Sequence, residues 1–190
     1  MIANRFSKRF KFKNWPNPKI PQVAAGVYVI WRDEELIYAG MSGREIEKAI
    51  KAGKKKYGLI TRLASHAGGR LSGDQFCVYV ANRIVIPELK QSQLVKFKDG
   101  EITLDQMTKK FIRTYLEYQY LIVDKSQDAY DLEMHCRKGS VFGSKPLLNP
   151  SYEKLDRYLI PSLYKSSSAL KIFFSAEFRL CKTGIEFGGL

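Results

Sequence analysis

Two short apolar runs with a polar break between them, GVYVIWR and LIYA, most constrain the fold of this chain. The first run starts at Gly26, the second ends just before Gly40, and three acidic residues separate them. β-Branched and aromatic residues dominate both runs, and this composition around a short break predicts a β-hairpin. The hairpin would place Tyr28 and Tyr38 on neighbouring strands. The two glycines would let a backbone or a ligand approach closely.

The charge of the chain indicates a polyanionic partner. Its 190 residues carry 32 Lys and Arg against 19 Asp and Glu, a formal net charge of +13. We expect nucleic acid rather than a membrane, because the sequence has neither an amphipathic anchor nor a long apolar run. The basic N-terminus lacks the apolar segment of a secretory signal.

Cys77, Cys136 and Cys181 are too few and too widely spaced for a zinc site or a disulfide framework, which favours reduced thiols in a cytoplasm.

The length suits one domain with an appended segment at each end. We expect a basic, aromatic arm over 1–22, a domain over 23–150 and a C-terminal extension over 151–190. The arm holds Phe6, Phe10, Phe12 and Trp15 among lysines and arginines, and no acid. Two interpretations stay open. The arm lies along a phosphate backbone or a partner subunit, or its aromatic side chains pack back on the domain.

Periodicity and turn residues predict the remaining elements. Residues 44–52 are expected to be helical with Ile46, Ala49 and Ile50 on one face. Thr103, with Gln106 three residues later, has the form of a helix-capping box. Further helices are predicted over 59–67, 88–97, 103–115, 128–138 and, weakly, 151–164; strands are predicted over 75–86, 117–123 and 171–181.

Several polar residues then stand out by position. Arg62 and His66 lie four residues apart, so they project from one face of their helix. Glu133 follows Leu132 in the helix over 128–138, and Asn149 lies in a Pro-rich turn. Taken singly, each has an ordinary explanation, such as a solvated cation, a helix-end histidine, a surface ion pair or a turn residue.

Taken in order, these features resemble the GIY-YIG nuclease family. Gly26-Val27-Tyr28 matches the first signature and Tyr38-Ala39-Gly40 the second, with valine and alanine in place of isoleucines. The resemblance covers roughly residues 24–150. It implies an α/β (α+β) domain whose small, mainly antiparallel central sheet is flanked by helices. Extra segments at 43–57 and 88–115 look like the insertions of GIY-YIG type II restriction endonucleases.

The resemblance also implies the site and its partners. The catalytic residues would be Tyr28, Tyr38, Arg62, His66, Glu133 and Asn149. Glu133 would hold one Mg²⁺, or Mn²⁺ in its place, per active site. The substrate would be double-stranded DNA, cut at a short palindromic site by a homodimer that forms at least on DNA. A DNA methyltransferase would be the functional counterpart, in a bacterial cytoplasm.

The residue types suit phosphodiester hydrolysis on chemical grounds as well. The reaction needs an activated water, a Lewis acid and stabilisation of developing negative charge. A single carboxylate such as Glu133 suits a hard cation that keeps most of its waters, although Glu117 is a rival for this role. Arg62 can hold a phosphate through two parallel hydrogen bonds. Tyr28 is the candidate general base; because the pKa of a free tyrosine is about 10, it would need help from cations or metal-bound water. His66 can shuttle protons.

Other polar residues are candidates for DNA contact. We expect the basic loop at Lys54, Lys55 and Lys56 to meet phosphates, and base edges to be contacted by residues among Arg70, Gln75, Arg83, Gln91 and Gln93. Two alternatives to a restriction enzyme remain. One is a homing or repair nuclease, and the other is a non-catalytic DNA-binding module on the same scaffold.

Overall fold

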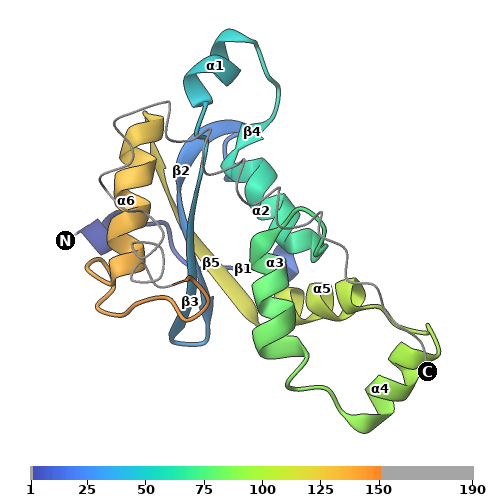
Figure 1. Ribbon diagram of the computed structural model, residues 1–190. Helices are drawn as coiled ribbons and strands as arrows, with labels where there is room; N and C mark the ends of the chain where they lie inside the picture. Colours follow the sequence, from blue (N-terminus) through green and yellow to red (C-terminus); the bar gives the residue numbers. More distant parts are fainter. Residues whose placement is uncertain (1, 151–190) are drawn as a thin grey trace, which may run out of the picture. The chain divides into compact units, whose positions relative to one another are not determined.

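The computed structural model describes residues 2–150, in which five strands form a mostly antiparallel open sheet with helices on both faces (Figure 1). The strand order is β1-β5-β2-β3, and the two-residue strand β4 pairs in parallel with β2 off this path. The expected α+β architecture is therefore confirmed for this part of the chain. Among the described residues, no helix has both the length and the apolar character needed to cross a membrane.

The predicted hairpin is present, formed by β2 (Val23–Arg32) and β3 (Glu35–Ser42). On its other side β2 pairs antiparallel with β5 (Leu116–Val123), which in turn pairs with β1 (Phe10–Lys11). Because β2 is internal to the sheet and both of its faces are covered, eight of its ten residues are buried. This explains why the run is continuously apolar rather than alternating.

The helices largely follow the predicted pattern. Helices expected over 44–52, 59–67, 103–115 and 128–138 are present, and Thr103 caps its helix by accepting a hydrogen bond from the Gln106 amide at 3.2 Å. Of the three apolar residues expected on one face of α1, Ile46 and Ala49 are buried and Ile50 is 62% exposed. The bounds are η1 Ile2–Arg5, η2 Phe12–Asn14, α1 Ile46–Lys51, β4 Tyr57–Gly58, α2 Leu59–Gly68, α3 Gln75–Val80, η3 Ala81–Val85, α4 Gln91–Lys98, α5 Leu104–Tyr115 and α6 Ser126–Lys138.

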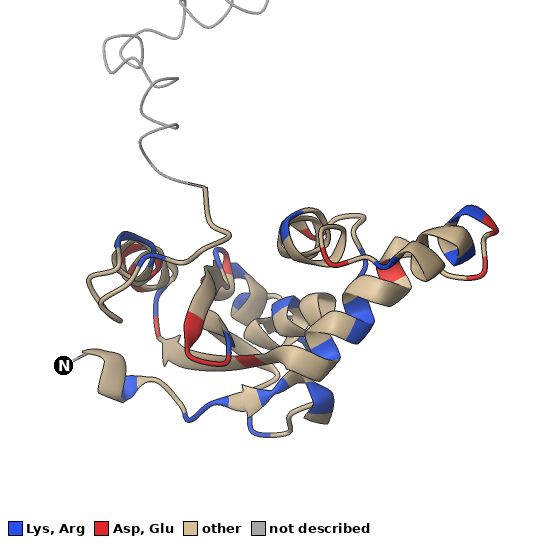
Figure 2. Ribbon diagram, turned by 90° about the horizontal axis from the view of Figure 1, so that it is seen from below, with Lys and Arg blue, Asp and Glu red and all other residues tan. Residues whose placement is uncertain are grey.

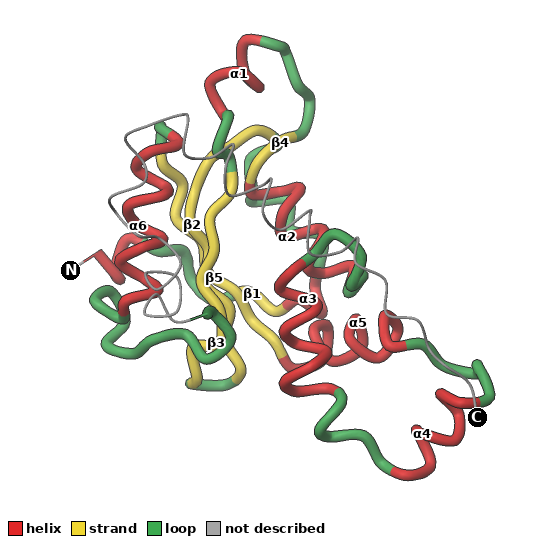
Figure 3. Tube along the Cα trace, in the orientation of Figure 1, coloured by secondary structure: helices red, strands yellow, loops and turns green. Residues whose placement is uncertain are grey.

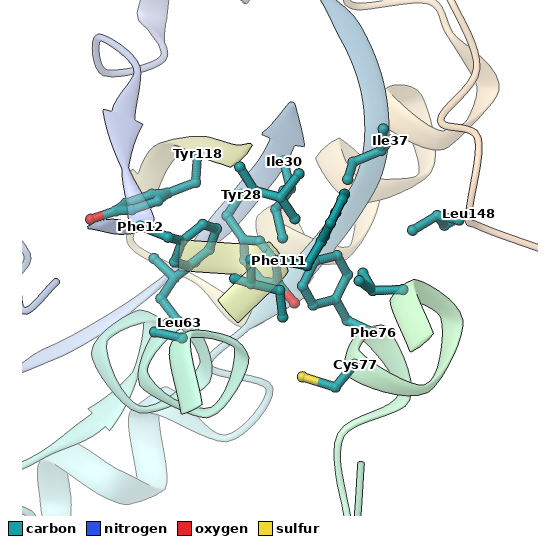
Figure 4. Packing of buried hydrophobic residues seen from close by; sticks show 14 of the residues in the cluster. Phe12, Tyr28, Ile30, Ile37, Leu63, Phe76, Cys77, Phe111, Tyr118 and Leu148 are labelled. Atoms are coloured by element: carbon teal, nitrogen blue, oxygen red, sulfur yellow. The ribbon is translucent and has the colours of Figure 1, made fainter. Parts of the chain in front are cut away.

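Two hydrophobic cores lie on opposite faces of the sheet. Tyr28 and Ile30 belong to the larger core, together with residues of α2, α3, η3 and α5 (Figure 4). The alternate residues Val27 and Val29 pack with Ala129 and other side chains of α6. The strand alternation thus places Tyr28 on the side of the sheet covered by α2 and α3, opposite the side covered by α6.

The predicted strand over 75–86 is wrong, since this segment forms α3 followed by the π-helical turn η3 (Figure 3). Its β-branched and aromatic residues favour a strand by composition. Burial nevertheless follows a helical rather than a two-residue period. Phe76, Cys77, Val80 and Ala81 are buried, whereas Asn82 and Arg83 are exposed. Packing against the sheet therefore outweighs the local propensity.

The N-terminal segment packs its aromatic residues on the domain. Phe12 is fully buried in the larger core, Phe6 is buried in the smaller one, and Phe10 stacks on Tyr118. Its lysines remain exposed, and the ribbon that follows the N-terminus shows basic but no acidic residues (Figure 2). The helix expected over 151–164, the strand expected over 171–181 and Cys181 lie outside the described residues.

Candidate active site

The centre of the site is a buried hydrogen bond between Tyr28 of β2 and His66 of α2. Tyr28 Oη lies 2.8 Å from His66 Nε2, and both side chains are about 2% exposed. Gly40 stands opposite Tyr28 in the β2–β3 register. A methyl group there would lie 2.5 Å from Tyr28 Oη, so only glycine leaves room for this tyrosine.

A third buried residue, Asp74, completes this chain of hydrogen bonds. Asp74 Oδ2 lies 2.7 Å from His66 Nδ1 and accepts a hydrogen bond from Ser65 Oγ at 2.6 Å. Burial alone would raise the pKa of Asp74, but the hydrogen bonds and charge interactions from His66 and Ser65 outweigh it and lower the pKa. Burial lowers the pKa of His66 despite this partner. The pair is therefore a neutral imidazole beside an ionised carboxylate.

Tyr38 and Arg62 lie around this pair. The Tyr38 ring centroid is 6.3 Å from that of Tyr28 and 6.2 Å from that of His66. Burial raises the pKa of Tyr28 well above 10, Tyr38 raises it further, and the Arg62 guanidinium lowers it only in part. The cationic help expected for Tyr28 is thus present in Arg62, but burial prevails and the phenol stays protonated near neutral pH.

Glu133 lies on α6, whose buried side chains pack on the other face of the sheet from Tyr28. It lies one turn from both Ala129 and Cys136, which are fully buried, so its side chain is only 14% exposed. Burial raises the pKa of Glu133, while Arg137, 3.7 Å away, and Arg44 oppose the rise. Burial raises the pKa of Tyr38 to about 12, and the Glu133 carboxylate is the next cause. Glu133 therefore shares one electrostatic environment with the tyrosines, and it is not a solvated surface ion pair.

Asn149 has a different position from the other candidates, at the open edge of β3. Its side-chain amide donates to Ala39 O at 2.9 Å and accepts from Ala39 N at 2.8 Å. The amides of Leu147 and Leu148 donate to β3 carbonyls in the same way. This segment therefore pairs the backbone of an edge strand, and Asn149 fixes the strand that carries Tyr38.

A cavity of about 390 Å³ opens at the first turns of α2, and its lining includes Ser65, the residue before His66. Its lining includes Arg44, Arg62 and Ser42, whereas the lining hydroxyls of Thr61 and Ser65 already donate to Gly58 O and Asp74 Oδ2. Arginine forks and hydroxyl donors are the groups that recognise phosphate oxygens. The cavity is thus suited to an anionic, phosphate-bearing ligand.

The residues present are compatible with a divalent cation at Glu133. This carboxylate is largely buried, and its ion pair with Arg137 is long, at 3.7 Å. A hard cation that keeps several waters would compensate such a group. His66, Asp74 and Cys77 also place ligand atoms within 4.8 Å of one another. Their nitrogen and oxygen atoms are already hydrogen-bonded, and burial raises the pKa of the Cys77 thiol, so this cluster does not indicate Mg²⁺.

The residues expected to contact DNA are placed as follows. Lys54, Lys55 and Lys56 are exposed in the loop between α1 and β4, at one end of the sheet (Figure 1). Arg70, Gln75 and Gln91 are exposed as well. Two others have intramolecular partners: Arg83 donates to Leu147 O at 2.7 Å, and Gln93 accepts from Lys90 N at 2.9 Å.

Sequence reasoning missed two residues of this constellation, Asp74 and Arg44. Asp74 immediately precedes α3 and accepts from the amides of Phe76 and Cys77 at 3.1 and 3.3 Å. An aspartate at this position is a recognisable N-cap signal, but the strand expected over 75–86 concealed it. Arg44 follows the second signature in a loop, where no periodicity distinguishes it from a solvated cation.

Neither family models, nor curated proteins, nor solved structures gave a match for this chain.

Proposed function

We propose that this protein is a divalent-metal-dependent endonuclease of the GIY-YIG type that cuts double-stranded DNA, most like a type II restriction enzyme. One observation carries the proposal. Four residues named from the sequence act on one another's protonation or hydrogen bonding, and they are Tyr28, His66, Arg62 and Glu133. The adjoining cavity with Arg44 and Arg62 adds the phosphate-binding chemistry that this reaction needs.

In the proposed reaction, Arg62 and Arg44 hold the scissile phosphate and stabilise the charge that develops on its oxygens. Tyr28 contacts the attacking water and receives its proton, while His66 is the acceptor behind Tyr28. Glu133 would hold the Mg²⁺ or Mn²⁺ ion, which supplies Lewis-acid polarisation of a phosphate oxygen when bound. Asn149 positions β3 and hence Tyr38 from outside the reaction centre.

The proposed substrate follows from charge. The net charge of +13, with the exposed Lys54–Lys56 loop beside the cavity-lining residues Arg44 and Tyr57, favours a duplex whose backbone crosses this end of the sheet. Arg70, Gln75 and Gln91 remain the candidates for base contact. A methyltransferase of the same specificity would then protect the host DNA.

We further propose that cleavage uses a homodimer. Each chain offers one such site, and cutting both strands at a palindrome needs two sites related by a two-fold axis. Helix α4 has no buried residue, and Leu94, Val95 and Phe97 on it are exposed. Exposed apolar side chains on a helix support a contact with a second copy on DNA.

Substituting the metal-binding candidate tests the function. Glu133→Gln should keep the fold and DNA affinity but lose cleavage of plasmid DNA in Mg²⁺, because a neutral amide cannot compensate a divalent cation. The matched control is Glu117→Gln on β5, which should cut as the wild type does. Discrete fragments would indicate sequence specificity, and a mixed dimer with one Glu133→Gln chain should mainly nick supercoiled plasmid. Substantial cutting by Glu133→Gln and loss of it in Glu117→Gln would contradict the assignment.

A further inference from the structure

Asp74 is a buried carboxylate whose full set of contacts exceeds what its helix requires. Its side chain is 1% exposed, and among the described residues its ion-pair partner is His66. Oδ1 accepts from the amides of Phe76 and Cys77 and thereby caps α3. Oδ2 accepts instead from Ser65 Oγ and lies against His66 Nδ1. Serine or asparagine could cap the helix without burying a charge. The second oxygen therefore needs an explanation other than capping.

The contacts of Oδ2 determine which nitrogen of His66 carries the proton. An ionised carboxylate only accepts hydrogen bonds, so the 2.7 Å contact requires a proton on Nδ1. In a neutral imidazole Nε2 is then an acceptor, and the 2.8 Å contact requires Tyr28 Oη to donate to it. The hydrogen bonds thus run in one direction, from Tyr28 to His66 to Asp74. The lone pairs of Tyr28 Oη stay available to accept a proton.

We propose that Asp74 is a positioning residue that holds His66 in the tautomer able to accept the proton of Tyr28, so that the three residues form a directed proton relay. This inference rests on the proposed nuclease function. In the step, the attacking water gives one proton to Tyr28 Oη while Tyr28 gives its own proton to His66 Nε2. The water oxygen bonds to phosphorus, the bond from phosphorus to the leaving oxygen breaks, and that oxygen takes a proton from solvent water.

The relay accounts for the burial of Tyr28. Burial raises the pKa of Tyr28 well above 10, so a free phenolate would be scarce at neutral pH. In the relay Tyr28 is neutral before and after the step, and the positive charge forms on His66 beside the ionised Asp74. A buried imidazolium is stabilised by such a partner. Asp74 therefore contributes to the reaction without touching the substrate.

The test compares Asp74→Asn with a second variant of Asp74 and with one control. Asparagine can still cap α3, but its amide would donate to His66 Nδ1 and force the proton to Nε2. We expect kcat to fall roughly 10²- to 10⁴-fold with KM little changed, as for a triad histidine held in the wrong tautomer. Asp74→Ser keeps a capping oxygen without the carboxylate and should lose kcat likewise. Thr103→Ala, which uncaps α5, should lower the stability of the fold and leave kcat unchanged.

A readout independent of cleavage is the tautomer itself. The chain has two histidines, His66 and His135, so ¹⁵N-histidine labelling gives a simple NMR spectrum with His135 as internal reference. Wild-type His66 should carry its proton on Nδ1, and Asp74→Asn should move it to Nε2. Wild-type His66 protonated on Nε2 would overturn the inference, as would a tautomer switch that leaves kcat at the wild-type value. A wild type with the expected tautomer but no nuclease activity would overturn the proposed function, and the relay with it.

Discussion

Gly40→Ala should damage both the fold and the site, because this glycine faces the phenol of Tyr28. A methyl group at position 40 would lie 2.5 Å from Tyr28 Oη, 2.7 Å from Tyr28 Cζ and 3.0 Å from Tyr38 Cε1. An ordinary carbon contact is about 3.5–4.0 Å, so the Tyr28 ring must move by roughly 1 Å. The ring is buried on every side, and a shift of this size also separates Oη from His66 Nε2, now 2.8 Å away.

The magnitude combines two costs. Forcing an extra methyl group into a packed core costs about 1–3 kcal/mol. Leaving Tyr28 and His66 buried without their hydrogen bond costs roughly another 1–3 kcal/mol. The free energy of unfolding should therefore fall by at least about 2 kcal/mol, which for a domain of this size lowers Tm by roughly 4–8 °C. If the variant folds, displacement of the proton-accepting oxygen by roughly 1 Å should reduce kcat by roughly 100-fold.

The assay pairs this variant with Gly68→Ala at the end of α2. Residue 68 has open space within 4 Å, and alanine is the better helix former, so this control should match or slightly exceed wild-type stability. Thermal unfolding measures the first effect and plasmid cleavage in Mg²⁺ the second. Wild-type stability of Gly40→Ala would refute the packing argument whatever the cleavage result. Normal kcat in a clearly destabilised Gly40→Ala would refute the role of Tyr28.

Two further predictions concern charge. Replacing Lys54, Lys55 and Lys56 with alanine should weaken binding to all duplex sequences alike. The slope of log K against log salt should fall by about one unit per lost phosphate contact. An unchanged slope in fluorescence titrations would show that the loop points away from DNA. For stability, burial lowers the pKa of His66, which faces Asp74, Tyr28 and Arg62. Since its pKa is lower in the folded state, the unfolded chain binds the proton first as pH falls. Stability should therefore decline below the ordinary histidine pKa of about 6.5, by at most about 1.4 kcal/mol per pH unit. Urea unfolding of wild type and His66→Gln at several pH values would measure this, and equal slopes would contradict it.

Elements whose signals are local could be predicted from the amino-acid sequence. The hairpin follows from two adjacent apolar runs, and the shared helix of Arg62 and His66 follows from four-residue spacing. The helix that carries Glu133 follows from the helical pattern over 128–138. These inferences succeed because period and turn chemistry operate within a few residues.

The contacts between those elements, and the burial and protonation that follow from them, depend on the tertiary structure. Residues 75–85 became helical because their burial against the sheet outweighed a β-prone composition, and Asp74 became a helix cap as a result. The pKa of Tyr28 and the tautomer of His66 depend on burial and on contacts between residues that lie far apart in the sequence. Asn149 became the partner of an edge strand for the same reason. Such properties depend on the distances between elements and on the exclusion of water, which no local pattern encodes.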